Sequence, residues 1–210
     1  SPKLATTSTG IDVTGITVSD GMSTNTSGTS NFIAGVNAGN SIVSGGNYNT
    51  VVGDEAGTAL TTGDANVAMG FQALATEDAN GTNTAIGYQS LKTLNAGADG
   101  NNTAVGYIAG VFLTTGIENT LIGGLAGDAL TDADYNVAIG VSALSADTKG
   151  NRNIAIGYHA LVTQNFTSST DSYNVAVGYA AGGAVSTGIY NTLIGSLAGD
   201  ALTDADTNVA

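Results

Sequence analysis

The sequence predicts an all-β solenoid, a parallel β-roll in which coils of about 17 residues stack on one another. Three observations lead to this fold class: a short repeat of nearly constant length, a glycine at one fixed place in every repeat, and an aliphatic run before that glycine. Each repeat begins with an asparagine, and these are Asn31, Asn49, Asn66, Asn83, Asn102, Asn119, Asn136, Asn153, Asn174 and Asn191, with a truncated eleventh copy from Asn208.

The repeat predicts one short strand and one corner per coil. With each asparagine taken as position 0, seven of the ten intervals are 17 residues, and the others are 18, 19 and 21. Positions 1 to 3 are rich in β-branched and aliphatic residues, which favour a strand. Position 4 is always glycine, which indicates a positive φ or a closely approaching neighbour. Helix is disfavoured, because each glycine costs roughly 1 kcal/mol relative to alanine.

The asparagine column and two variable positions describe the interior of the coils. Stacked asparagine amides are expected to bond one another along the solenoid. Position 8 is Gly in six coils and Leu in four, and position 11 compensates, so both are expected to fill one core layer. Position 11 is Ile42, Leu60, Leu113, Leu130, Val185 and Leu202 in the Gly coils, and Glu77, Leu94, Asp147 and Gln164 in the Leu coils.

Position 2 is apolar in every unit, whereas positions 1 and 3 should point to the opposite face of the strand. A strand that is apolar on both faces is covered on both faces. We therefore predict that position 2 needs a cover outside its own coil, and that the chain forms a side-by-side homotrimer. Position-6 residues such as Ile108, Leu125 and Leu197 are expected near the seam.

Two parts are predicted along the chain. Residues 1–30 form a strand-rich connector, with short strands in Thr9–Gly21 and a polar linker from Ser23 to Ser30. Residues 31–210 form the β-roll of ten complete coils and a truncated eleventh. Because the chain begins without Met and ends inside a repeat, we expect it to be part of a longer polypeptide.

The composition excludes several classes of partner. The net charge is −13 and the only basic residues are Lys3, Lys92, Lys149 and Arg152, so nucleic-acid binding is not expected. Attraction to an anionic membrane surface is disfavoured for the same reason. No apolar run approaches the ~18 residues of a transmembrane helix, so direct membrane insertion is not expected either.

No catalytic set is apparent, so no enzymatic activity and no cofactor are predicted. There is no Cys, the single His159 occupies a variable slot, and no Ser lies in a nucleophile-elbow context. Solvated loop charge is favoured for the repeated acidic runs, and calcium binding through carboxylates is the alternative. The candidate ligands are Asp128, Asp132, Asp134, Asp200, Asp204 and Asp206.

Aromatic residues gather at position 5. Packing at a subunit interface or along an outer edge is the favoured interpretation, and a strip that stacks on carbohydrate is the alternative. The residues concerned are Phe71, Tyr88, Tyr107, Tyr158 and Tyr179.

The motifs Asn83-Thr84-Ala85-Ile86-Gly87-Tyr88-Gln89-Ser90-Leu91 and Asn102-Thr103-Ala104-Val105-Gly106-Tyr107 resemble two related families. One is the NTAVGYxAL-type repeat region of phage tail fibres and similar trimeric fibrous proteins. The other is the YadA-like head of trimeric autotransporter adhesins, whose usual period of about 14 is shorter than the period here. The resemblance covers residues 31–210. It implies a left-handed β-roll, three chains side by side, and attachment to a surface.

Four functions are compatible with these observations. The favoured one is a structural, non-enzymatic virion fibre or tail-associated protein, located outside the cell, with other virion proteins and a host-surface glycan or protein as partners. The alternative is the head of an adhesin on the bacterial cell surface. A depolymerase would require a carboxylate-lined groove between chains. An ice-binding solenoid ranks last, because the threonines at position 1 are interrupted; they are Thr50, Thr84, Thr103, Thr120 and Thr192.

Overall fold

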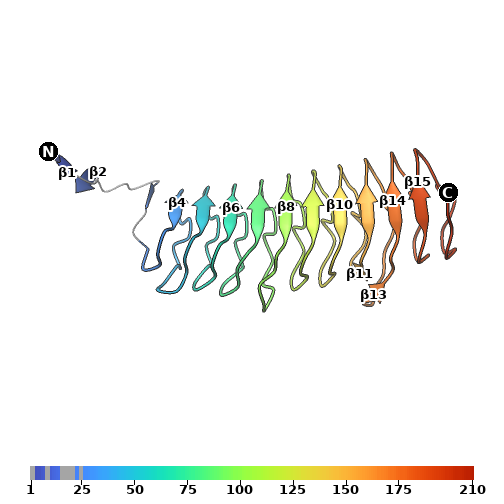
Figure 1. The fold of residues 1–210 in the computed structure, drawn as a ribbon, viewed down its shortest axis with the longest axis horizontal. Coiled ribbons are helices and arrows are strands. Elements are labelled where there is room, and N and C mark those ends of the chain that lie inside the picture. Colours follow the sequence, from blue (N-terminus) through green and yellow to red (C-terminus); the bar gives the residue numbers. More distant parts are fainter. Residues whose placement is uncertain (1–2, 8–9, 15–21, 24–25) are drawn as a thin grey trace.

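The computed structural model describes residues 3–7, 10–14, 22–23 and 26–210. From Asn31 onward the chain winds into a β-solenoid, and every complete coil contributes one three-residue strand at positions 1 to 3, as predicted (Figure 1). These strands are β4 (Phe32–Ala34), β5 (Thr50–Val52), β6 (Val67–Met69), β7 (Thr84–Ile86), β8 (Thr103–Val105), β9 (Thr120–Ile122), β10 (Val137–Ile139), β12 (Ile154–Ile156), β14 (Val175–Val177) and β15 (Thr192–Ile194).

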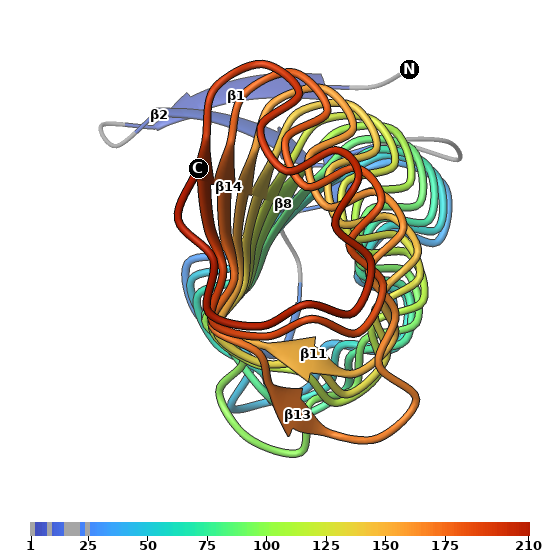
Figure 2. The ribbon, with the colours of Figure 1, turned by 90° about the vertical axis from the view of Figure 1, so that its right-hand side faces the viewer.

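The ten strands form one parallel sheet in which each strand pairs with the strands of the adjacent coils. The register is position to position, so Val51 pairs with Ala68 and Ala104 with Leu121. Backbone hydrogen bonds also join the coils outside the sheet, for example from Leu74 N–H to the Ser90 carbonyl at 3.0 Å. Viewed along the axis, the coils superimpose into one outline with the strands along one side (Figure 2).

The glycine at position 4 ends each strand, and both reasons predicted for it are found: a positive φ and a closely approaching neighbour. The φ angles at position 4 lie between 125° and 146° in all ten coils. A Cβ added to Gly106 would collide with the carbonyl group of Gly123 in the next coil. Only glycine fits, because other residues rarely adopt this φ and any Cβ would meet backbone. Position 8 is less restricted: its φ is near 50°, and Leu74 and Leu161 adopt it.

The asparagines form the predicted ladder. Each backbone N–H at position 0 donates to the side-chain oxygen of the asparagine one coil earlier; for Asn136 to Asn119 Oδ1 the distance is 2.9 Å. Most side-chain amides also donate to a carbonyl at the end of their own coil, as Asn136 Nδ2 does to Gly150 at 2.9 Å. All ten asparagines from Asn31 to Asn191 are buried. Their polar groups are therefore satisfied inside the coil instead of by water.

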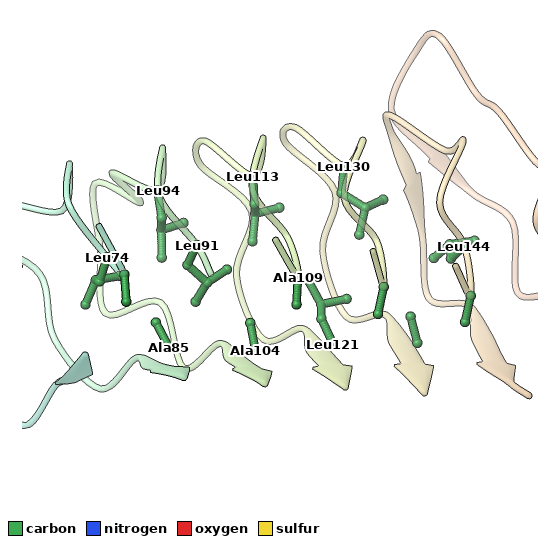
Figure 3. Packing of buried hydrophobic residues seen from close by; sticks show 14 of the residues in the cluster. Leu74, Ala85, Leu91, Leu94, Ala104, Ala109, Leu113, Leu121, Leu130 and Leu144 are labelled. Atoms are coloured by element: carbon green, nitrogen blue, oxygen red, sulfur yellow. The ribbon is translucent and has the colours of Figure 1, made fainter. Parts of the chain in front are cut away.

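The prediction for position 2 was wrong in one respect. Position 2 side chains point into their own coil, where Ala85, Ala104 and Leu121 pack against residues from the opposite wall (Figure 3). The residues at this position in the complete coils are at most 2% exposed in the single chain, so they need no outside cover. The face that lacks a cover is the outer one, formed by positions 1 and 3.

Positions 8 and 11 share a core layer, as predicted. A Cβ on Gly127 would lie 2.8 Å from Leu130 Cδ1 and 2.8 Å from Leu121 Cδ2. Position 2 therefore takes part in the same volume balance, which the sequence analysis missed. Every coil with Leu at position 8 has Ala at position 2, and these alanines are Ala68, Ala85, Ala138 and Ala155. The polar position-11 residues Glu77, Asp147 and Gln164 are also fully buried.

The N-terminal part contains three strands. β1 (Lys3–Thr7) and β2 (Gly10–Thr14) form an antiparallel pair, and β3 (Met22–Ser23) pairs antiparallel with β4 at the first coil. Of the strands predicted in Thr9–Gly21, only 10–14 is described; residue 9 and residues 15–21 lie outside the described residues, as do 24–25 of the predicted linker. The end of this linker is attached to the first coil, because Thr29 N–H donates to Asn47 Oδ1 at 2.8 Å. No helix capable of crossing a membrane occurs in the described residues.

Candidate functional site

Exposed large hydrophobic side chains gather on one face of the solenoid. Apart from Val43 and Phe112, they all occupy positions −1, 1, 3, 5 or 6, where position −1 is the residue before each asparagine. These positions are the outer surface of the strands and the corners at either end of them. We call this the outer strand face; its exposed large hydrophobic residues are Phe32, Val36, Tyr48, Met69, Phe71, Tyr88, Tyr107, Ile122, Tyr135, Val141, Ile154, Tyr158, Tyr173, Tyr179, Tyr190, Ile194, Leu197 and Val209.

The predicted aromatic column at position 5 is present along this face. The rings of Phe71, Tyr88 and Tyr107 stack with centroids 5.4 Å apart, and Tyr158 stacks on Tyr179 at 5.5 Å. Stacking directs the ring faces toward one another along the column, so the column is packed along an outer edge of the chain. A sugar that stacks on an aromatic ring needs a free ring face, which only the ends of these columns offer.

A second column, at position −1, was missed by the sequence analysis. The guanidinium carbon of Arg152 lies 4.4 Å from the Tyr135 ring centroid and 5.9 Å from that of Tyr173. Tyr173 in turn stacks on Tyr190 at 5.5 Å. The signal in the sequence was the recurrence of Tyr immediately before the repeat asparagine. Only the coiling places these residues, 17 or 21 positions apart, directly above one another.

The longest coil lies beside this second column. It has 21 residues, and its extra residues form a loop that projects from the solenoid (Figure 2). In this loop, β13 (Thr170–Asp171) pairs in parallel with β11 (Gly150–Asn151) of the preceding coil. The Asn151 amide donates to Ser169 Oγ at 3.1 Å and to Asp171 Oδ1 at 3.2 Å. Asp171 Oδ2 lies 3.3 Å from Arg152 Nε. The loop and the arginine are therefore held in one arrangement.

Two buried carboxylates, Asp147 and Glu77, hold the lengthened loops by accepting hydrogen bonds on the core side of the chain. Asp147 accepts hydrogen bonds from Gly150 N–H and Phe166 N–H, each at 3.0 Å, and from Gln164 Nε2 at 2.6 Å. Glu77 accepts from Asn80 Nδ2 at 3.1 Å and Ala96 N–H at 3.3 Å. Burial raises the pKa of Glu77, and the hydrogen bond from Asn80 partly opposes the rise. Neither carboxylate is accessible to a substrate, because both are fully buried.

The six candidate calcium ligands do not converge. Among the described residues, no three His, Cys, Asp or Glu side chains lie together in a way that could hold a metal ion. Asp134 and Asp206 instead accept backbone N–H groups of the preceding coil, from Ile117 at 2.9 Å and Ile189 at 2.8 Å. They occupy equivalent positions, and each one links its coil to the preceding coil by a hydrogen bond.

The other four candidates do not share the role of Asp134 and Asp206. Asp132 lies 3.5 Å from Lys149 Nζ at the surface, and Asp204 accepts from Thr203 Oγ1 at 3.1 Å. One oxygen of Asp128 is buried without a hydrogen-bond partner in the described residues, and burial raises the pKa of this carboxyl. Its counterpart Asp200 is exposed. The arrangement gives the calcium interpretation no support.

The remaining candidates are ordinary surface positions. His159 stacks on the neighbouring Tyr158 at 3.8 Å. The threonines of position 1 pair in an unbroken row only from Thr84 through Thr103 to Thr120. Comparisons with protein-family models, curated proteins and solved structures gave no match. The function must therefore be argued from the geometry of the chain itself.

Proposed function

We propose that this chain is a stiff, non-enzymatic fibre segment that assembles as a side-by-side homotrimer and serves attachment to a host surface. The observation that carries the proposal is the outer strand face, where exposed apolar side chains recur along the length of the solenoid. Contiguous apolar surface of this kind marks interfaces between proteins. Water contact along such a face is unfavourable, and a second and third copy packed against positions 1 and 3 would remove it there. The corner at position −1, which holds Tyr135, Arg152 and Tyr173, would stay open to solvent.

The repeat itself favours copies of the same chain as the cover. Equivalent residues recur at each coil, so a neighbouring solenoid in register would meet the same kind of surface along its whole length. Three equivalent copies close around a threefold axis and leave no further face open. The path in Figure 2 supports the left-handed winding: the chain climbs along the strands, crosses over the top and descends as it advances toward the viewer.

Stiffness follows from the bonding between coils. The parallel sheet, the asparagine ladder and the backbone bonds outside the sheet join each coil to the next. At about 4.8 Å per coil, the ten coils would make a rod roughly 48 Å long. Such a rod would hold a receptor-binding part away from a particle, and its surface would add weak multivalent contacts to a glycan or protein. A virion fibre with other virion proteins as partners is favoured over an adhesin on the bacterial surface, because the N-terminal sequence from Lys3 to Gly15 resembles strand segments of marine phage structural proteins.

Light scattering coupled to size exclusion tests the assembly, and a mass three times the 20.6 kDa of one chain is expected. Ile122→Asp, on the outer strand face, should shift the protein to monomers. Phe112→Asp is the matched control, because Phe112 is also a large exposed apolar residue (58% exposed, against 36% for Ile122) but lies off that face. A monomeric wild-type protein would refute the trimer.

Immunogold labelling of virions with an antibody against this segment tests the biological setting. Label on particles is expected, and label confined to bacterial envelopes would instead support the adhesin. Degradation of host polysaccharide by the purified protein would overturn the non-enzymatic part of the proposal.

A further inference from the structure

The regular repeat is interrupted most strongly at the place where the only arginine lies. The coil that begins at Asn153 has four residues more than the usual 17, and they lengthen its last loop. In repeat proteins such insertions form loops on one face, which is often the binding face. Arg152 immediately precedes this coil, and it is the single guanidinium in a chain of net charge −13. A local requirement other than solenoid packing would explain both departures.

The guanidinium of Arg152 is restrained from three sides. Tyr135 of the coil before and Tyr173 of the coil after place rings 4.4 Å and 5.9 Å from its carbon. Asp171 approaches its Nε at 3.3 Å, and Asn151 holds Asp171 by a hydrogen bond of 3.2 Å. The faces of aromatic rings attract a guanidinium, so the planar group has a preferred orientation before any ligand arrives.

The terminal nitrogens of this guanidinium are available. Asp171 approaches Nε, whereas neither Nη group donates a hydrogen bond within the described residues. The side chain of Arg152 is 40% exposed, so these groups are accessible to a ligand. A planar guanidinium with free terminal N–H groups matches a carboxylate, because two parallel N–H···O bonds form at once.

The surroundings indicate which kind of carboxylate fits. The Tyr135 and Tyr173 side chains on either side of the arginine are 38% and 44% exposed. On the adjoining loop, the exposed Ser169 accepts a hydrogen bond from the Asn151 amide at 3.1 Å through its Oγ. Hydroxyl groups both donate and accept hydrogen bonds, as sugar hydroxyls do. The carboxylate side chains of an acidic peptide accept hydrogen bonds but carry no hydroxyl groups that could donate them.

We propose that Arg152, held between Tyr135 and Tyr173 and beside Asp171, binds the carboxylate of an acidic sugar. The biological meaning of this site rests on the proposed attachment function. The binding itself does not, because every residue of the site belongs to one chain.

Calorimetric titration of the whole chain with trigalacturonate, at low ionic strength, tests the site. Binding is expected, and the neutral methyl ester of the same trisaccharide should bind at least tenfold more weakly. Arg152→Gln should lose at least tenfold in affinity. Arg152→Lys keeps the charge but loses the planar fork, so it should lose most of the affinity as well.

Two variants separate a built site from general electrostatics. Lys92→Gln makes the same change in net charge at a distant coil, and it should leave the affinity unchanged. Asp171→Asn removes the competing carboxylate but keeps an oxygen for Asn151, so the affinity should rise a few-fold. A purely structural role for the Tyr–Arg–Tyr stack predicts no such gain. The Asp171→Asn result also decides the matter if circular dichroism shows that Arg152→Gln is unfolded.

Three outcomes would overturn the site: equal binding of the ester, equal losses in Lys92→Gln and Arg152→Gln, or tighter binding of triglutamate than of trigalacturonate. Light scattering on the same samples keeps the two proposals distinguishable. A trimer that ignores the sugar would refute only the site. A monomer that binds it through Arg152 would refute only the trimer.

Discussion

The two faces of the strand column differ in how closely the repeat constrains them. On the inner face, position 2 is always aliphatic, and in the complete coils it is fully or almost fully buried. On the outer face, positions 1 and 3 range over Phe, Thr, Val, Ile, Met and Ala, and their side chains are half-buried or exposed. The inner face must fit a closed volume shared with the opposite wall. In the single chain, the outer positions only need residues that are compatible with a β-strand.

This difference shows why two neighbouring residues of one strand can have unrelated roles. Ala68 is fully buried and cannot be enlarged without displacing Leu74 and its neighbours. Met69, the next residue, points to the opposite face of the strand and is 39% exposed. The inner face therefore determines whether the coil closes. The outer face is free to determine what the solenoid binds.

The largest expected effect contrasts these two residues directly. Ala68→Asp should destabilise the chain by on the order of 4 kcal/mol, because it places an unpaired charge in a sealed core. Met69→Asp should change the stability of the single chain by less than about 1 kcal/mol. Urea denaturation followed by circular dichroism measures both, in the Ile122→Asp background that is expected to be monomeric. Equal losses would mean that the outer face is as constrained as the inner one.

A smaller effect tests the volume balance of the inner face. Leu130→Ala should cost about 2–4 kcal/mol through lost burial and a remaining cavity. Adding Gly127→Leu to that variant should recover part of the loss, since position 8 holds leucine at nearly the same φ in other coils. The recovery should be larger when Leu121 is also changed to alanine, as in every natural Leu coil. No recovery in either background would show that the two positions do not share a layer.

The smallest effect concerns Glu77, a fully buried carboxyl at position 11 whose pKa is raised by burial. Because Glu77 holds its proton more tightly in the folded chain, the free energy of unfolding should fall as the pH rises from the usual value of 4.5 through the folded pKa. Glu77→Gln should remove this decline and melt at a higher temperature than wild type at pH 8. At pH 4 the two proteins should melt alike. Gln164 already occupies this position in a later coil, so glutamine fits it; a wild-type melting temperature that stays flat across this pH range would contradict the prediction.

Much of the inner face could be predicted because it is periodic. The spacing of the asparagines located all ten strands of the complete coils at positions 1 to 3, and the alternation at positions 8 and 11 located a shared core layer. A stacked fold repeats each local environment, so the same physical requirement acts at every coil and leaves a regular pattern in the sequence. Glycine at position 4 is an example: its positive φ recurs in all ten coils, and its close backbone neighbour recurs in the nine coils before the last.

The sequence by itself determined the solenoid, its period and its ladders, because hydrogen bonding and core volume are local to adjacent coils. Only the tertiary structure decided which strand face is sealed, since alternation sets position 2 against positions 1 and 3 without saying which side is inside. It also decided that Tyr135, Arg152 and Tyr173 meet, and that Asp134 brackets a neighbouring coil instead of joining a metal site. Those contacts depend on how far each loop carries the chain before the next coil begins, and loop geometry is not periodic.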